Sequence, residues 1–160
     1  MSVTQAPTSR TVEARHTIDA SPDEVFAAWV TAELIAAWWG PEGFTSVVRE
    51  LDASEGGRFV FEMIGPDGVS SYTAGFYREL KRPDRLVMEF TEHCNADLPD
   101  GVEPQLEPSM VTVEFLKRGT RTEVVVTHAA LLPAYSELAT FGWSSSLGKL
   151  ARTVARAMAR

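Results

Sequence analysis

The stretch from residue 17 to residue 44 limits the possible folds of this chain more than any other. It opens at the end of an alternating, strand-like run that closes at Ile18. Residues 21–24, Ser-Pro-Asp-Glu, then form a helix start with the elements of a capping box. Thr31 is positioned to cap a second short helix. That helix is predicted to end at residues 39–41, because the glycine and proline there turn the chain. The stretch therefore predicts a strand, two short helices and a tryptophan pair at their exit.

Alternating apolar and polar residues dominate the chain from residue 44 to residue 128. The spacing predicts strands over residues 12–18, 44–51, 58–64, 70–80, 85–91, 109–116 and 122–128. Turns with glycine or proline join most consecutive strands, so neighbouring strands are expected to be antiparallel. The exception is the segment 92–108, which is polar, acidic and contains prolines, and which is predicted to be a mobile loop.

A long amphipathic helix is predicted over residues 134–160. Its apolar side chains recur at steps of three and four, at Trp143, Leu147, Leu150, Val154 and Met158. Its basic side chains, from Lys149 to Arg160, are interpreted as a solvated face that suits the helix dipole. A curved antiparallel sheet needs cover for its concave face, and this helix is the available cover. We therefore predict an α+β protein whose curved sheet of six or seven antiparallel strands wraps around the C-terminal helix. Residues 1–9 are expected to be a flexible tail, and residues 10–160 a single domain.

Composition argues against several classes of protein. A net charge of −7 disfavours nucleic-acid binding, which needs a basic surface. Charges interrupt the longest apolar runs, which fall short of the roughly 20 apolar residues of a membrane-spanning helix, so no membrane insertion is expected. The single cysteine, Cys94, excludes an intramolecular disulfide and favours a reducing cytoplasm. His16, His93 and His128 lie on different predicted elements without carboxylates at metal-site spacing, so neither a metal nor a cofactor is predicted.

Aromatic and thioether side chains are concentrated on the alternating strands and beside the long helix. A single helix held by a broad sheet leaves space between them, so we expect a cavity with an apolar lining. The predicted lining residues are Trp38, Trp39, Phe59, Phe61, Met63, Tyr72, Phe76, Met88, Phe90, His128, Trp143 and Leu147. The alternative interpretation is that these side chains form a filled core.

Polar residues on the same strands offer fewer possibilities for chemistry. Tyr72 and Tyr77 lie on opposite faces of one predicted strand, so at most one phenol projects inward, where it could orient a carbonyl oxygen. His128 could be a general base or a hydrogen-bonded core residue. Glu62 and Glu79 would act as acids if they were buried, but the alternation predicts surface positions for both. These residues do not form a recognisable catalytic set, so the sequence favours a protein that is not an enzyme.

A series of short motifs runs in order along most of the chain. They are Ser21-Pro22-Asp23-Glu24-Val25-Phe26, Trp38-Trp39-Gly40-Pro41, Gly56-Gly57-Arg58-Phe59, Pro66-Asp67-Gly68, Gly75-Phe76-Tyr77-Arg78-Glu79, Arg85-Leu86-Val87, Val111-Thr112-Val113 and Gly142-Trp143. Together they resemble the START-like (SRPBCC) superfamily and, within it, the homologues of the heat-shock-protein-90 ATPase activator. The resemblance extends from about residue 11 to residue 150. It implies a helix-grip fold with a pocket, in a superfamily whose members bind lipids, hormones or polyketides or act as cyclases.

The leading hypothesis is that the chain binds a small hydrophobic or amphipathic molecule between the sheet and the C-terminal helix. One alternative is an enzyme of the polyketide cyclase or hydrolase kind that uses Tyr72 or Tyr77 with His128. Another is a chaperone-linked interaction protein. In the eukaryotic activator this domain follows a separate amino-terminal domain that docks on the chaperone, and this chain has no room for one, which argues against chaperone contact. The sequence leaves a homodimer open.

Overall fold

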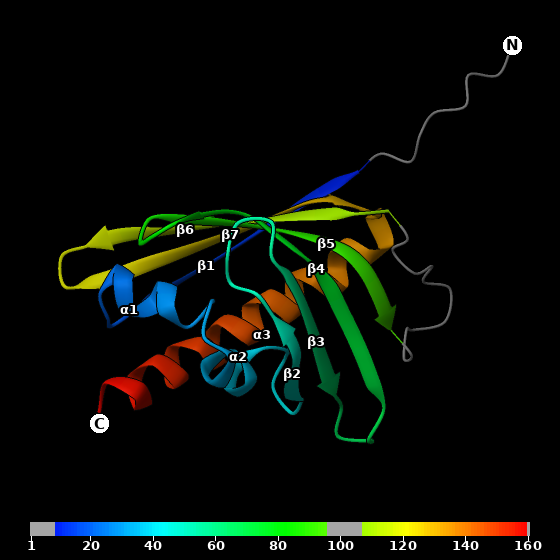
Figure 1. The fold of residues 1–160 in the computed structure, drawn as a ribbon, viewed down its shortest axis with the longest axis horizontal. Coiled ribbons are helices and arrows are strands. Elements are labelled where there is room, and N and C mark those ends of the chain that lie inside the picture. The colour runs from blue at the N-terminus through cyan, green and yellow to red at the C-terminus, as the bar shows by residue number, and fades with distance from the viewer. Residues whose placement is uncertain (1–8, 96–106, 160) are drawn as a thin grey trace, which may run out of the picture.

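The computed structural model, which describes residues 9–95 and 107–159, is an antiparallel sheet that grips a long helix (Figure 1). Its elements are β1 (Arg10–Ile18), α1 (Pro22–Ala27), α2 (Ala32–Trp38), β2 (Thr45–Leu51), β3 (Arg58–Ile64), β4 (Ser70–Lys81), β5 (Arg85–Asn95), β6 (Ser109–Arg118), β7 (Arg121–Leu131) and α3 (Pro133–Met158). The 7-stranded sheet has the order β1-β7-β6-β5-β4-β3-β2, and every neighbouring pair is antiparallel. Figure 1 shows α3 crossing one face of the curved sheet, with α1 and α2 on the same side. The predicted α+β helix-grip fold is confirmed.

The two short helices begin differently from each other. The hydroxyl of Ser21 accepts a hydrogen bond from the Glu24 amide, and the Glu24 carboxylate accepts one from the Ser21 amide, which completes the predicted capping box of α1. Thr31 is the N-cap residue of α2, as predicted, but its side chain makes no capping hydrogen bond. The predicted stop is confirmed. Trp39 is the C-cap of α2, and Gly40 has a φ of 92°, in the left-handed region that favours glycine.

Some predicted strand boundaries are too short. Residues 92–95 belong to β5 rather than to the predicted loop, because they pair with β4, whose twelve residues extend the ladder in that direction. The next segment of that loop, residues 96–106, lies outside the described residues, as does the predicted tail over residues 1–8. β7 continues to Leu131, and Pro133 follows as the first residue of α3, a position that suits proline.

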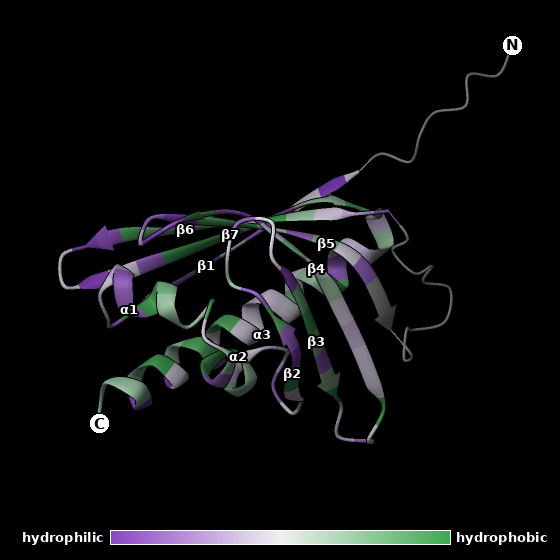
Figure 2. Cartoon of the chain, viewed as in Figure 1, coloured by the Kyte–Doolittle hydropathy of each residue, from purple (hydrophilic) through white to green (hydrophobic). Residues whose placement is uncertain are grey.

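The hydrophobic core lies between the concave face of the sheet and the helices. Every second residue from Ser109 to Phe115 on β6 is buried, and Figure 2 shows hydrophobic and hydrophilic residues mixed along the strands. From α3, Trp143, Leu147, Leu150 and Val154 join the core as predicted. Met158 does not, because it is exposed at the end of the helix. The period of α3 therefore positions four aromatic or aliphatic side chains against the sheet.

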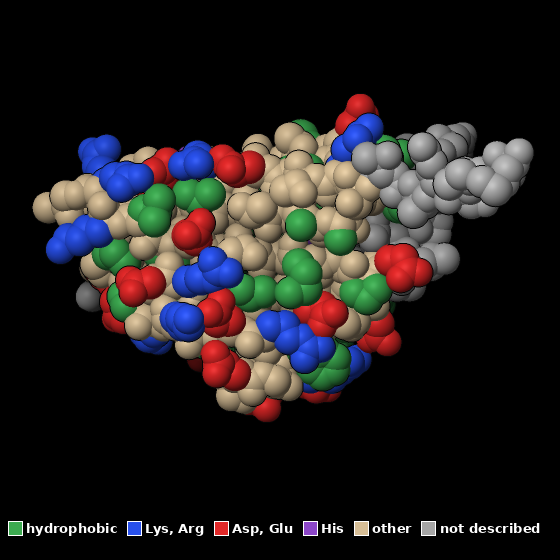
Figure 3. Space-filling view, turned by 90° about the horizontal axis from the view of Figure 1, so that it is seen from above, with side chains coloured by type: hydrophobic (Ala, Val, Ile, Leu, Met, Phe, Trp, Pro, Cys, Tyr) green, Lys and Arg blue, Asp and Glu red, His purple; other side chains and the backbone are tan. Residues whose placement is uncertain are grey.

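The outer face of the sheet carries charges of both signs side by side (Figure 3). Arg58 pairs with Glu92 at 3.0 Å, and Arg78 pairs with Glu89. The ring of Phe76 lies between the two guanidinium groups, 5.8 and 5.1 Å from their central carbons. Cation–π contacts of this kind give an outward aromatic ring a favourable partner without burial in the core.

Candidate functional site

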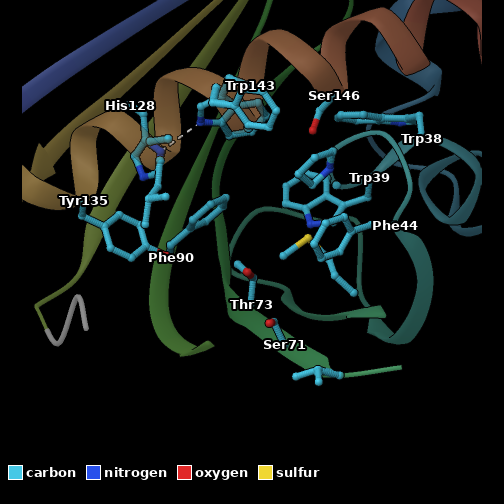
Figure 4. Close-up of a pocket in the computed structure, with 18 of the residues that line it drawn as sticks. Trp38, Trp39, Phe44, Ser71, Thr73, Phe90, His128, Tyr135, Trp143 and Ser146 are labelled. Atoms are coloured by element: carbon cyan, nitrogen blue, oxygen red, sulfur yellow. Dashed lines mark hydrogen bonds between the residues drawn. The ribbon is translucent and has the colours of Figure 1, made fainter. Parts of the chain in front are cut away.

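A cavity of about 520 Å³ lies between the first half of α3 and the sheet, a volume in the range of small-molecule sites. Its lining residues are Trp38, Trp39, Gly40, Pro41, Phe44, Met63, Pro66, Asp67, Val69, Ser71, Thr73, Phe90, His128, Tyr135, Leu138, Ala139, Phe141, Gly142, Trp143 and Ser146. Most of this surface is carbon. Figure 4 shows aromatic rings from β5, from α3, from α2 and from the connection between α2 and β2 around the space.

The structure divides the predicted lining residues into three groups. The first group lines the cavity and consists of Trp38, Trp39, Met63, Phe90, His128 and Trp143. The second is buried in the core behind it and consists of Phe59, Phe61, Met88 and Leu147. The third consists of Tyr72 and Phe76, which lie on the opposite face of β4, so their predicted placement in the cavity is wrong. Alternation correctly separated the two faces of this strand, but the inward face is that of Ser71, Thr73 and Tyr77.

The cavity lining also includes residues that were not predicted, from the first turns of α3 and from the connection before β2. Tyr135, Leu138 and Gly142 extend the apolar stripe of α3 toward its N-terminus at steps of three and four, and this periodicity was a usable signal. Phe44 had no such signal, because it lies in the short connection before β2. Ser71 and Thr73 lie on the face of β4 opposite Tyr72 and Phe76, the side chains that were predicted to line the cavity.

An interlocked set of aromatic rings forms the inner wall of the cavity. The Trp39 ring centroid lies 4.8 Å from that of Phe61 and 5.8 Å from that of Trp143, both in edge-to-face geometry. Trp29 packs behind them, stacked on Trp143 at 5.9 Å. Trp38 is fixed by a 2.8 Å hydrogen bond from its indole nitrogen to the Ala28 carbonyl. These contacts hold the wall in one arrangement before any ligand arrives.

His128 is a positioning residue for Trp143 rather than a free base. The indole N–H of Trp143 donates to Nδ1 of His128 at 3.0 Å, the contact drawn in Figure 4. An indole N–H is only a donor, so Nδ1 must be unprotonated and the proton of the neutral ring lies on Nε2. Nε2 lies 2.8 Å from the Ser109 hydroxyl oxygen and therefore donates to it. Both ring nitrogens are thus engaged, which supports the core interpretation of His128.

The segment 40–44 closes one side of the cavity and is fastened to α3. The amide of Glu42 donates to the Ser145 hydroxyl at 2.8 Å, and the carboxylate of Glu42 pairs with Arg152. The ammonium group of Lys149 donates to the carbonyls of Pro41 and Phe44 at 3.3 and 3.1 Å. Burial lowers the pKa of Lys149. Lys149 is therefore not part of the solvated basic face predicted for this helix.

The other candidates for proton transfer do not meet at the cavity. Tyr77 is fully buried and donates to the Trp29 carbonyl at 2.8 Å, and burial raises the pKa of its phenol. Glu62 is buried against expectation, but hydrogen bonds from Ser70 and then from Arg49 lower the pKa of its carboxyl. It is therefore an ionised partner on the outer side of β3, not an acid. Tyr72 lies on the exposed face of β4, so neither tyrosine lines the cavity beside His128.

No group of three or more histidine, cysteine or acidic side chains in the described ranges 9–95 and 107–159 is placed to hold a metal ion. The lining itself offers hydroxyl, imidazole and carboxylate groups that are few and separated by aromatic rings. Glu79, the remaining predicted acid, forms ion pairs with Arg85 and Lys81, and these lower the pKa of its carboxyl.

The two tyrosines of β4 provide a test of this assignment. Tyr77→Phe is expected to lower the free energy of unfolding by about 1–3 kcal/mol, because the buried Trp29 carbonyl loses its donor. Tyr72→Phe, on the exposed face of the same strand, is expected to cost less than about 1 kcal/mol. Urea unfolding with an unchanged m-value measures both. Equal costs for the two variants would contradict the buried hydrogen bond.

No helix among the described residues combines the length and the apolar character needed to cross a membrane. A family model described as "Activator of Hsp90 ATPase homolog 1-like protein" matches residues 19–155. No curated protein sequence matches the chain.

Solved structures from several bacteria have a similar fold. One is a protein from Chromobacterium violaceum, with 25% identity, coverage of 90% of this chain and 96% of that chain, and a TM-score of 0.78. Another is the AHSA1 protein from Silicibacter pomeroyi, with 23% identity, coverage of 91% and 98%, and a TM-score of 0.73. A third is an AHSA1-like protein from Aeromonas hydrophila, with 23% identity, coverage of 94% and 96%, and a TM-score of 0.71.

Proposed function

The chain belongs to the family of Activator of Hsp90 ATPase homolog 1-like proteins, and we propose that it binds a small hydrophobic or amphipathic molecule in the cavity between the sheet and α3. The observation that carries this proposal is that the space beneath the first half of α3 remains open. Further along the same helix, Leu147, Leu150 and Val154 are buried in the core. The proposal therefore assigns the two halves of α3 to different tasks.

The character of the wall supports binding rather than catalysis. Burial of apolar surface stabilises a complex by about 25 cal/mol per Å², and the wall exposes mainly aromatic and aliphatic carbon. Because Trp38, Trp39 and Trp143 are already held by hydrogen bonds and ring contacts, a ligand would lose little affinity to ordering them. Among the described residues no comparable feature favours the cyclase-like or the chaperone-linked alternative.

Thermal unfolding of the purified protein with and without 2-naphthalenemethanol and 1-decanol tests the proposal. At a free concentration about 100 times the Kd, a ligand of the folded state contributes about 2.7 kcal/mol, which raises Tm by about 5–10 °C in a protein of this size. Because Trp39 and Trp143 line the cavity, tryptophan fluorescence should titrate with the same Kd. An unchanged Tm and fluorescence across a broad panel of such probes would count against a ligand site.

A further inference from the structure

Three hydroxyl groups that line the cavity form no hydrogen bond with the described residues. Ser71, Thr73 and Ser146 are 8%, 6% and 5% exposed, and all three line the cavity. No hydrogen bond joins their hydroxyl groups to another described side chain or backbone group. In Figure 4, Ser146 lies on the α3 side and Ser71 and Thr73 lie on the β4 side, with aromatic rings between them. Because these hydroxyl groups line the cavity and form no bond within the described part of the protein, each of them can exchange a hydrogen bond with a polar atom of a ligand.

The charges around the cavity limit what that ligand can be. Among the described lining residues there is no lysine or arginine. The nearby Lys149 is not a lining residue, and its ammonium group is bonded to the carbonyls of Pro41 and Phe44. His128 is held neutral by Trp143 and Ser109. The single carboxylate, Asp67, lies on an exposed turn and accepts the Val69 amide at 3.0 Å. A carboxylate or phosphate in this cavity would therefore be buried without a counter-charge, at a large cost.

We propose that the cavity selects uncharged ligands that carry oxygen functions at two ends of an apolar body. One end bonds to Ser71 and Thr73 on β4, and the other bonds to Ser146 on α3. The aromatic rings between them, including Trp39 and Phe44, cover the apolar body. This assignment rests on the proposed ligand-binding function and gives it a chemical class, namely hydroxyl- or carbonyl-bearing neutral molecules rather than free fatty acids or phosphate esters.

Five probes that share one ring system test the charge and hydroxyl assignments separately. They are 2-methylnaphthalene, 2-naphthalenemethanol, 2,6-naphthalenedimethanol, 2-naphthoate and 2-naphthylmethylammonium, titrated by calorimetry at pH 7.5. The affinity should rise from the hydrocarbon to the alcohol to the diol by about 2- to 10-fold per hydroxyl group. The carboxylate should bind about 100-fold more weakly than the alcohol, or worse. The ammonium should also bind more weakly than the alcohol, because Asp67 is solvated.

Matched variants locate the hydroxyl contacts. Thr73→Val and Ser146→Ala should each remove about 2- to 10-fold of the affinity for the diol and leave the affinity for 2-methylnaphthalene unchanged. Ser144→Ala, on an exposed position of the same helix, is the control and should change neither. Equal effects of Thr73→Val and Ser144→Ala on the diol would overturn the assignment of that hydroxyl.

The outcomes separate this inference from the function on which it rests. If none of the five probes binds, the proposed function itself is contradicted. If 2-naphthoate binds as tightly as 2-naphthalenemethanol, the site is real but the selection against anions is overturned. If the ammonium binds most tightly, the aromatic wall acts as a cation–π site instead, and the neutral class is overturned.

Discussion

Gly142→Leu is expected to abolish the binding of naphthalene probes while leaving the fold at least as stable as before. Gly142 lines the cavity from α3, and a Cβ atom built there meets no atom within 4 Å. A leucine side chain would extend into the space that the probe needs. Leucine also favours the helix over glycine by roughly 0.8–1 kcal/mol, so the loss of binding would not reflect unfolding. We expect Kd to rise at least 100-fold, because overlap with the ligand cannot be relieved without moving the tryptophan wall.

Gly148→Leu is the matched control for this experiment. Gly148 lies on the same helix outside the cavity, and a Cβ there also meets no atom within 4 Å. It should raise the stability by a similar amount and leave probe binding within about twofold of wild type. Calorimetric titration of 2-naphthalenemethanol, with Tm measured on the same samples, compares the two variants. Undiminished binding to Gly142→Leu would show that the probe binds elsewhere and would contradict the cavity as its binding site.

The fold of this protein could be predicted from local patterns because each pattern has a strong physical cause. The capping box at Ser21 and Glu24 satisfies amides that would otherwise lack partners, and Gly40 is at a positive φ that other residues rarely adopt. Alternation correctly placed Phe59 and Phe61 of β3 on the buried face, although Glu62 on the other face is buried as well. The apolar steps of α3 correctly identified Trp143, Leu147, Leu150 and Val154 as core residues, whereas Met158 at the end of the helix is exposed.

The site was less predictable than the fold. It depends on which face of each strand meets the helix and on which part of the space between the sheet and α3 is left without side chains. Alternation on β4 gives two equivalent faces, and the aromatic Phe76 favoured the wrong one. Its ring is stabilised outside by Arg78, two residues along the same strand, and by Arg58, which strand pairing brings opposite Phe76. The contact with Arg58 is not recognisable along the chain. Because the face of β4 that carries Phe76 points outward, Ser71 and Thr73 on the other face point inward.

The distinction between core and cavity is a second feature that sequence patterns do not encode. Phe61 and Trp39 are both aromatic, both buried and 4.8 Å apart between ring centroids, yet only Trp39 reaches the open space. That difference arises from the path of α3 over the curved sheet. The curvature in turn depends on irregularities in strand pairing, which no hydrophobic period reveals.

Gly75→Ala is expected to lower the free energy of unfolding much more than Gly68→Ala does. Gly75 lies on β4 at a shift in register against β5, where the ladder moves from Ala74 opposite Glu92 to Gly75 opposite Phe90. A Cβ atom at this position would lie 1.8 Å from the backbone carbonyl oxygen of Glu89. That oxygen belongs to a paired strand in the middle of the sheet, so it cannot move aside as a flexible side chain would. The free energy of unfolding should fall by more than about 3 kcal/mol, a large part of the 5–15 kcal/mol typical of a domain.

Gly68→Ala separates this clash from the general cost of replacing glycine. Gly68 lies in the turn between β3 and β4 with a φ of 85°, and a Cβ there meets no atom within 4 Å. Its cost should be limited to the roughly 1–2 kcal/mol of a left-handed residue with a side chain. Urea unfolding of both variants, followed by circular dichroism, gives the comparison. If Gly75→Ala proved no more costly than Gly68→Ala, the register shift on β4 would be free to relax, and Gly75 would not fix the curvature that keeps the cavity open beneath α3.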